Sequence, residues 1–343
     1  MDYRLAKREL RQGRIQPIYV CYGTEKYLLD EFIAELTAKL IEPGHQDFAL
    51  AKLDLTEASL ESAIDEAQEP PFIVPRKLIV AKNALFLTGA KDQGKLEHPV
   101  DKLQQYMVHP SDFAVLVLTV EAEKLDERKK IVKLLKEKDV LIPFLPMTEE
   151  ELRQWVARQA EKEQVQLGPG AGEELLLYTG GSLQSVAGEI RKLATFAGPG
   201  GTVGAEDVRR LVVPGTEQNV FLLIENIVQL KLERAFAIFY DLLKQKEEPI
   251  KILLLIARQF RIILQVKEYG RQGFAPQQIA GYLSLHPYAV KLAAEQGKRY
   301  DGARLSSILS QLAELDYKMK TGTMDKVLGL ELFLLRLAPE AGR

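Results

Sequence analysis

The chain has 343 residues, more than one ordinary hydrophobic core supports, which predicts two or three domains. Its hydrophobic content of 46%, charged content of 27% and net charge of −2 are typical of a soluble protein and exclude a global attraction to nucleic acid or anionic membranes. The single cysteine, Cys21, excludes an internal disulfide and favours a cytoplasmic location, and no apolar stretch is long enough to predict a membrane span.

The segment 1–146 alternates between patterns typical of strands and of helices. Short, nearly continuous apolar runs separated by amphipathic stretches predict an α/β domain with a parallel sheet covered on both faces. The expected strands are Pro17–Tyr22, Ala49–Leu55, Lys77–Ala81, Phe113–Val120 and Val140–Phe144, and the expected helices lie near Glu25–Leu40, Leu60–Gln68, Val100–Val108 and Leu125–Lys138.

The first strand runs into a helix where an α/β nucleotide-binding protein carries its phosphate loop. That loop needs two glycines, so that backbone N–H groups can surround phosphates, followed by Lys and Ser or Thr. Here Gly23 is followed by Thr24-Glu25-Lys26, with no second glycine and no Lys-Ser/Thr pair. Glu25 also brings negative charge to a helix end that would otherwise favour an anion. The sequence predicts the scaffold of an ATPase without its phosphate site.

The rest of the chain reads as helical, with no convincing strand. Thr148 opens a helix with a capping-box pattern, and the expected helices of a small unit, 147–213, are Thr148–Gln164, Ala171–Thr179, Leu183–Phe196 and Ala205–Leu211. Pro214-Gly215 marks a second boundary. The last domain, 214–343, is expected to be all helical, and Pro249–Gly270 carries a single polar stripe, typical of a helix inside a bundle.

Other candidates for chemistry favour structural interpretations. The glycine clusters at 168–172 and 198–201 follow no expected strand and precede no Lys-Ser/Thr, so they are interpreted as helix–helix turns. Glu121 follows a strand as a magnesium-binding acid does in ATPases, but it has no phosphate loop to serve and is interpreted as structural. The histidines are scattered without metal-ligand spacing, and Cys21 lies within a strand, so neither a metal, a cofactor nor a nucleophile is predicted.

The most unusual segment connects a helix to a strand and reads Glu69-Pro70-Pro71-Phe72-Ile73-Val74-Pro75-Arg76-Lys77. Proline fixes φ and removes an amide donor, so this stretch is expected to be extended and stiff. Stiffness lowers the ordering cost if Phe72 and Ile73 enter a pocket on a partner. The alternative is that both side chains fold back and fill the core beneath the sheet. The residues alone leave the two interpretations open.

The last domain is mildly basic, with 18 Lys and Arg against 14 Asp and Glu in 214–343. Near its end, Lys318 and Lys320 stand before Thr321-Gly322 and are candidates for contact with DNA phosphates. A solvated helix end before a turn is the favoured interpretation of the same residues.

Short motifs are spread over the whole chain. They are Pro17-Ile18-Tyr19, Tyr22-Gly23-x-Glu25-x-x-Leu28, Pro71-Phe72-x-x-x-Arg76-Lys77, Lys124-Leu125-Asp126, Gly180-Gly181-Ser182-Leu183, Glu248-Pro249-Ile250, Arg258-Gln259-Phe260-Arg261 and Leu315-Asp316-x-x-x-Lys320-Thr321-Gly322. Each motif is weak alone, but in their order and spacing the chain resembles the delta subunits of the bacterial DNA polymerase III clamp loader.

The resemblance implies an AAA+ type α/β domain without a working ATP site (1–146), a small helical lid (147–213) and an all-α collar for oligomerisation (214–343). It also implies a subunit without catalysis of its own, whose partners are the sliding clamp (beta), the ATPase subunits (gamma/tau), delta-prime and primed DNA. The family's clamp-contacting element is an apolar pair in the loop that holds Phe72. Its second member would be Ile73 or Pro71, because family members vary in the residue before the conserved Phe. The stretch Ile73-Val74-Pro75 also departs from the Phe-Gly-Glu that is common in such loops.

The expected function is therefore to hold the clamp ring open rather than to catalyse a reaction. Phe72 and its neighbour would enter an apolar pocket on the clamp. One alternative is a nucleotide hydrolase with an atypical phosphate site, which predicts saturable ATP binding. The other is a helical DNA-binding adaptor, which predicts steep salt dependence and no effect of Phe72.

Overall fold

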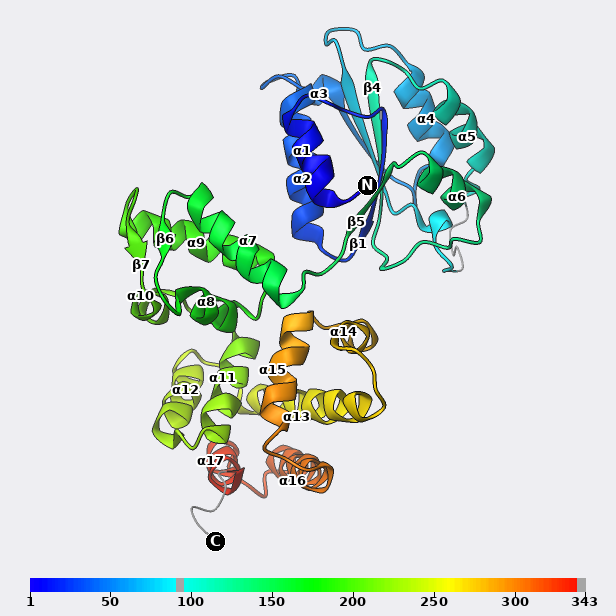
Figure 1. The fold of residues 1–343 in the computed structure, drawn as a ribbon. Coiled ribbons are helices and arrows are strands. Elements are labelled where there is room, and N and C mark those ends of the chain that lie inside the picture. The colour runs from blue at the N-terminus through cyan, green and yellow to red at the C-terminus, as the bar shows by residue number, and fades with distance from the viewer. Residues whose placement is uncertain (91–95, 338–343) are drawn as a thin grey trace. The chain divides into compact units, whose positions relative to one another are not determined.

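A computed structural model describes residues 1–90 and 96–337 of the chain and divides it into two compact units, Met1–Pro146 and Met147–Arg343. Figure 1 shows an α/β unit followed by helices. The boundary lies at Pro146, where the sequence changes from alternating strands and helices to helices. The further division of the second unit near Pro214 stays a prediction.

The first unit is built on a parallel sheet of five strands in the order β2-β3-β4-β1-β5 (Figure 1). The strands are β1 (Ile18–Gly23), β2 (Leu50–Asp54), β3 (Lys77–Lys82), β4 (Ala114–Val120) and β5 (Leu141–Phe144). All five expected strands are present, each within one residue of its predicted start. Register is fixed by pairs such as Ile18 with Leu116 and Lys77 with Ala114.

Helices cover both faces of this sheet, as the apolar strands predict (Figure 1). Side chains alternate along β1, so Ile18 and Val20 join the core beneath α4, α5 and α6 while Tyr19 packs edge-on against Phe32 of α2. The elements that surround the sheet are α1 (Tyr3–Arg11), α2 (Lys26–Leu40), α3 (Gln46–Ala49), α4 (Leu60–Gln68), η1 (Leu85–Leu87), α5 (Val100–Val108) and α6 (Lys130–Glu137).

The helix expected over Leu125–Lys138 begins later than predicted, at Lys130. The reason is the side chain of Asp126, which accepts hydrogen bonds from the backbone N–H and the guanidinium of Arg128 and so stabilises a turn. Aspartate competes for backbone donors in this way wherever a turn is available.

The second unit begins with four helices: α7 (Glu149–Lys162), α8 (Ala171–Thr179), α9 (Leu183–Ala197) and α10 (Ala205–Leu211). The predicted capping box at Thr148 and Glu151 is present. The expectation of no strand is wrong, because β6 (Gln166–Leu167) and β7 (Thr202–Val203) form a parallel pair. Consequently both glycine clusters connect a strand with a helix, not two helices. Strands of two residues carry no alternation that a sequence pattern can reveal.

The remaining helices share one hydrophobic core. In α13 the predicted polar stripe (Lys251, Arg258, Arg261, Gln265 and Glu268) is exposed, while Ile256, Phe260 and Ile263 are completely buried. The helices are α11 (Thr216–Val228), α12 (Leu232–Lys244), α13 (Pro249–Arg271), α14 (Pro276–Leu283), α15 (Pro287–Gly297), α16 (Gly302–Lys320) and α17 (Lys326–Leu337). None of the helices in the described ranges has the length and apolar character that crossing a membrane requires.

Candidate functional site

The end of β1, where a phosphate loop would begin, is closed by contacts within the protein. Gly23 pairs with Phe144 of β5, and a Cβ added at Gly23 would lie 2.0 Å from the Phe144 carbonyl oxygen. The backbone N–H of Glu25 donates to that same oxygen at 2.9 Å. Gly23 is therefore required by the close approach of two strands. The amide of Glu25 is bonded to protein and does not face an open loop.

The two charged residues beside this position pair with each other. Lys26 Nζ lies 2.8 Å from Oε2 of Glu121, and Glu121 is the first residue after β4. Glu121 occupies the place where ATPases carry a magnesium-binding acid, and here its partner is a lysine. This pairing agrees with the structural interpretation of Glu121. Both side chains are exposed, so the pair is a surface contact of small energy.

Glu25, at the start of α2, is largely buried, and this burial raises the pKa of its carboxyl to about 7. A carboxyl with a higher pKa in the folded chain binds protons more tightly there than in the unfolded chain. The folded state therefore gains relative stability at low pH and loses it as pH rises from about 4.5 to about 7.

From this shift we expect Glu25→Gln to stabilise the protein increasingly as pH rises. The gain over wild type should be near zero at pH 4.5 and reach about 1–2 kcal/mol at pH 8, less than the full shift implies because solvent reaches part of the carboxyl. Urea unfolding of both proteins at several pH values, followed by circular dichroism, measures it. A gain that is the same at every pH would contradict the raised pKa.

The proline-rich segment 69–76, here called the proline loop, joins α4 to β3 and exposes its two large apolar side chains. Phe72 is 101% exposed and Ile73 is 58% exposed, whereas Pro71 is half-buried. The alternative in which both side chains fill the core is therefore excluded. Of the two candidates for the second contact residue, Ile73 presents more surface to a partner than Pro71 does.

The proline loop is anchored at its base by a buried side chain and an ion pair. Val74 is 8% exposed, although its neighbours on both sides face solvent. Lys77, the first residue of β3, is buried and places its Nζ 2.9 Å from Glu66 Oε1 in the last turn of α4. Its backbone N–H donates to the Phe113 carbonyl. These contacts tie both ends of the loop to the same sheet and helix, which limits how far Phe72 can move.

The Glu66–Lys77 ion pair predicts that removing the acid costs more stability than removing the base. Glu66→Ala should destabilise the first unit by about 1–2 kcal/mol, because it leaves the ammonium of Lys77 buried without its partner. Lys77→Met should cost less, since Met fills a similar volume without a charge. Hydrogen exchange of the β3 amides in the two variants measures the difference. Equal destabilisation by both would show that the buried charge is not the cause.

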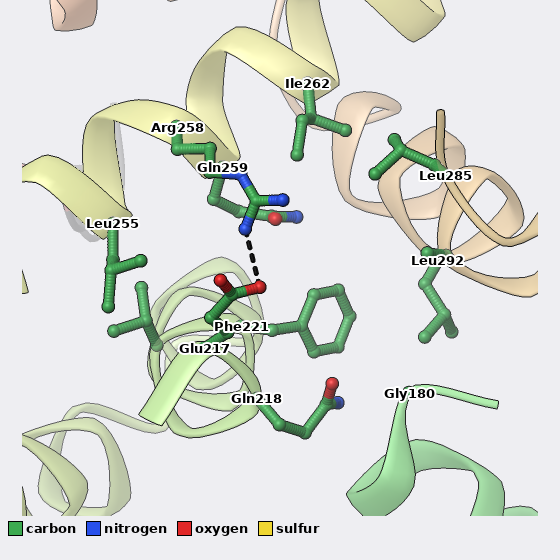
Figure 2. Close-up of a pocket in the computed structure, with 12 residues that line it drawn as sticks. Gly180, Glu217, Gln218, Phe221, Leu255, Arg258, Gln259, Ile262, Leu285 and Leu292 are labelled. Atoms are coloured by element: carbon green, nitrogen blue, oxygen red, sulfur yellow. Dashed lines mark hydrogen bonds and ion pairs between the residues drawn. The ribbon is translucent and has the colours of Figure 1, made fainter. Parts of the chain in front are cut away.

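The second unit contains a pocket lined by residues of α11, α13 and α15 together with Gly180 and Leu285 (Figure 2). Figure 2 shows Gln218 and Phe221 of α11 below Arg258 and Ile262 of α13, with Gly180 at one side. Apolar side chains dominate the lining, and the guanidinium of Arg258 donates to Glu217 Oε2 at 2.5 Å. A phosphate would therefore have to compete with a carboxylate for Arg258. Glu217 and Arg258, the two charged residues of the lining, pair with each other, and we interpret the pocket as a packing gap between helices.

The Gly180-Gly181 turn lies beside this pocket and packs closely against its neighbours. Both glycines have positive φ, and a Cβ at Gly181 would lie 3.1 Å from the Tyr288 side chain. Gln218 donates a hydrogen bond to the Leu177 carbonyl beside them. The Gly-Gly motif thus permits close packing of the α8–α9 turn on α11 and α15, and does not surround an anion.

The two candidate DNA-contacting lysines lie in the last turn of α16 and are already paired. Lys318 Nζ lies 2.6 Å from Glu314 Oε1, and Lys320 Nζ lies 2.7 Å from Asp316 Oδ2, each four residues earlier. The Thr321 and Thr323 hydroxyls donate to the Lys318 carbonyl and close the helix end. These contacts match the interpretation as a solvated helix end. A DNA contact there stays a prediction.

The pairing of the charged residues at these sites gave no signal in the sequence. Glu66 and Lys77 are eleven residues apart, and Lys26 and Glu121 come from different strand ends, so only the fold brings each pair together. Among the described residues no group of three or more His, Cys, Asp or Glu side chains is arranged to hold a metal ion. The proline loop is therefore the candidate site, and its two exposed large side chains are suited to apolar contact with a partner.

Comparisons with known proteins give the same family for both ends of the chain. Residues 19–144 match the family model of the DNA polymerase III delta subunit, and residues 217–337 match that of its C-terminal domain. The DNA polymerase III subunit delta of Bacillus subtilis is 43% identical over 330 residues, which cover 96% of this chain and 95% of that protein. A probable delta subunit of Aquifex aeolicus is 19% identical over 75% of this chain and 72% of its own length.

A solved structure gives the same result. The Bacillus subtilis DNA clamp loader delta protein superimposes with a TM-score of 0.83 at 42% sequence identity. The match covers 98% of this chain and 99% of that one. The similarity therefore extends over both units and is not confined to one domain.

Proposed function

The chain belongs to the delta subunits of the DNA polymerase III clamp loader, and on this premise we propose that it binds the sliding clamp through the proline loop and holds the ring open. Phe72 is the principal contact, Ile73 is the second, and Pro71 shapes the backbone before them. The subunit acts by binding and carries out no catalysis of its own. The observation that carries the proposal is the complete exposure of Phe72 on an anchored loop.

Exposure of this kind favours a partner. A phenylalanine in water gains from burial in an apolar pocket, and aromatic side chains are enriched among the residues that dominate binding energy. The prolines and the buried Val74 restrict the loop before binding, so less conformational entropy is lost when the complex forms. The two features together give a small, rigid, apolar projection.

Opening the ring requires that this projection bind the open clamp better than the closed one. To change a closed-to-open ratio from 1:99 to 99:1 takes about 5.5 kcal/mol of differential affinity. Burying one phenylalanine and one isoleucine contributes roughly 3–6 kcal/mol. The loop is therefore able to supply much of the bias, and strain stored in the closed ring supplies the remainder.

A clamp-loader delta subunit assembles with the clamp loader and the clamp. Within that assembly we assign residues 214–343 to a collar that meets the ATPase subunits (gamma/tau) and delta-prime, and 147–213 to a lid. Primed DNA is a partner of the whole assembly. ATP bound by the sibling subunits controls access of the proline loop to the clamp.

Ring opening itself is tested by removal of clamps from DNA. We expect the wild-type chain, without nucleotide, to accelerate the loss of clamps loaded on nicked circular DNA, because a closed ring leaves a circle only when one interface opens. Phe72→Ala should leave the loss rate close to the spontaneous rate. Gel filtration of labelled clamp on DNA circles measures both. Loss that is equally fast with the variant would contradict opening by Phe72.

The salt dependence of binding separates the proposal from a DNA-binding adaptor. An adaptor that acts through basic residues predicts affinity for DNA that falls steeply with salt, and no dependence on Phe72. The clamp-binding proposal predicts the reverse, because contact through apolar side chains depends weakly on ionic strength. The pairing of Lys318 and Lys320 with acidic neighbours favours the second outcome.

A further inference from the structure

Most of the exposed large apolar side chains of the first unit lie at the end of its sheet where strands β2, β3 and β4 begin. Five large apolar residues are exposed among its described residues: Phe48, Phe72, Ile73, Val108 and Leu145. The first four precede the amino ends of strands β2, β3 and β4, and only Leu145 follows a carboxyl end. We call these four residues the amino-edge surface.

The register of the sheet brings the members of this surface together. Leu50 of β2 pairs with Leu78 of β3, and Lys77 of β3 pairs with Ala114 of β4, so the three strands begin level with one another. Neighbouring strands lie about 4.8 Å apart, so the three starts span only about 10 Å. Phe48 stands two residues before Leu50, in α3.

The connection before β4 extends the surface on the other side of the proline loop. Val108 is the last residue of α5, and α5 packs against α4, whose carboxyl end leads into the proline loop. In Figure 1, α3 and the connections that follow α4 and α5 all lie at the same end of the sheet. Phe48 and Val108 are 64% exposed each and flank Phe72 and Ile73.

The size of a stable interface requires more than Phe72 and Ile73. A fully buried phenylalanine contributes about 150–250 Å², whereas a stable interface buries about 800 Å² on each partner. Whatever receives Phe72 must therefore also cover the ground around it. The large apolar side chains that are exposed beside the proline loop, among the described residues, are Phe48 on one side and Val108 on the other.

We propose that Phe48 and Val108 are further clamp contacts, which lie on either side of the Phe72 contact and are covered by the same clamp surface. This inference rests on the proposed function, because it assigns the clamp as the protein that receives Phe72. It predicts a footprint that spans the amino ends of three strands.

Thiol protection tests the footprint directly, because the native chain offers a clean background. Its single cysteine, Cys21, is completely buried. Variants Phe48→Cys and Val108→Cys therefore carry one reactive thiol each, and Val213→Cys, at a site 71% exposed in the second unit, is the matched control. Saturating clamp should slow alkylation at the first two sites at least about tenfold and leave the control within about twofold, as expected of residues inside and outside an interface.

The outcomes separate this inference from the proposed function. Protection of both sites, with affinity lost in Phe72→Ala, supports both. Unprotected thiols at 48 and 108, with affinity still dependent on Phe72, would overturn the inference alone. No binding by the wild-type chain would overturn both, since Phe72 is already exposed. Protection that appears when the chain is concentrated without clamp would assign the surface to a second copy and overturn the inference.

Charge insertion gives a second, independent measurement. Phe48→Asp and Val108→Asp should weaken clamp binding at least about tenfold, because each places a carboxylate in a surface that loses water on binding. Phe196→Asp and Val213→Asp, at exposed positions of the second unit, should change it less than about twofold. Equal effects at all four positions would contradict a local contact. All four residues are exposed, so the fold should tolerate each change.

Discussion

Replacing Phe72 with Ala is expected to weaken binding of the isolated chain to its own sliding clamp about 100-fold. Aromatic residues at the centre of an interface contribute about 2–4 kcal/mol, and each 1.4 kcal/mol is a factor of ten in affinity. The side chain is completely exposed, so its loss removes no contact from the folded subunit. Titration against labelled clamp without nucleotide, followed by fluorescence anisotropy, measures the change.

The matched control is Phe196→Ala, a phenylalanine that is 52% exposed in the second unit and should not affect clamp binding. Ile73→Ala and Pro71→Ala in the same titration identify the second contact residue, and the greater exposure of Ile73 predicts the larger loss there. Wild-type affinity in Phe72→Ala would retain the family assignment but move the clamp contact away from the proline loop.

Replacing Gly23 with Ala is expected to destabilise the first unit by at least about 3 kcal/mol. Gly23 has φ +141°, a conformation that residues with a Cβ rarely adopt. The added methyl group would also lie 2.0 Å from the Phe144 carbonyl oxygen, so β1 and β5 would have to separate. The same change would disturb the hydrogen bond from the Glu25 amide to that oxygen.

The control for this substitution is Gly44→Ala in the same unit. Gly44 also has positive φ, +93°, but a Cβ there would meet nothing within 4 Å, so it should cost only the conformational strain of about 1–2 kcal/mol. The single tryptophan, Trp155, lies in the second unit and does not report on the first. Hydrogen exchange of the slowest amides of β1 and β4 measures the free energy of unfolding of the first unit. Similar losses in both variants would show that the contact with Phe144 adds no strain.

The sequence predicted the sheet of the first unit well because its central strands, β1, β3 and β4, are short apolar runs that are buried on both faces. Ala114–Val120 is buried at every position, and a run of this kind is recognisable without a partner. The α7 capping box was equally recognisable, since its hydrogen bonds join residues three apart. The β6–β7 pair was missed because its two strands are two residues long and come from segments more than thirty residues apart.

The absence of a phosphate-loop motif, the stiffness of the proline loop and the resemblance to clamp-loader delta subunits were all determined by the sequence itself. These features depend on residue type and local spacing, which can be recognised without knowing any tertiary contact. Only the tertiary structure decided that Phe72 faces solvent, that Glu66 holds Lys77, and that Phe48 and Val108 flank the same loop. Exposure and pairing depend on which segments the sheet places side by side, and strand register sets that over distances no local pattern records.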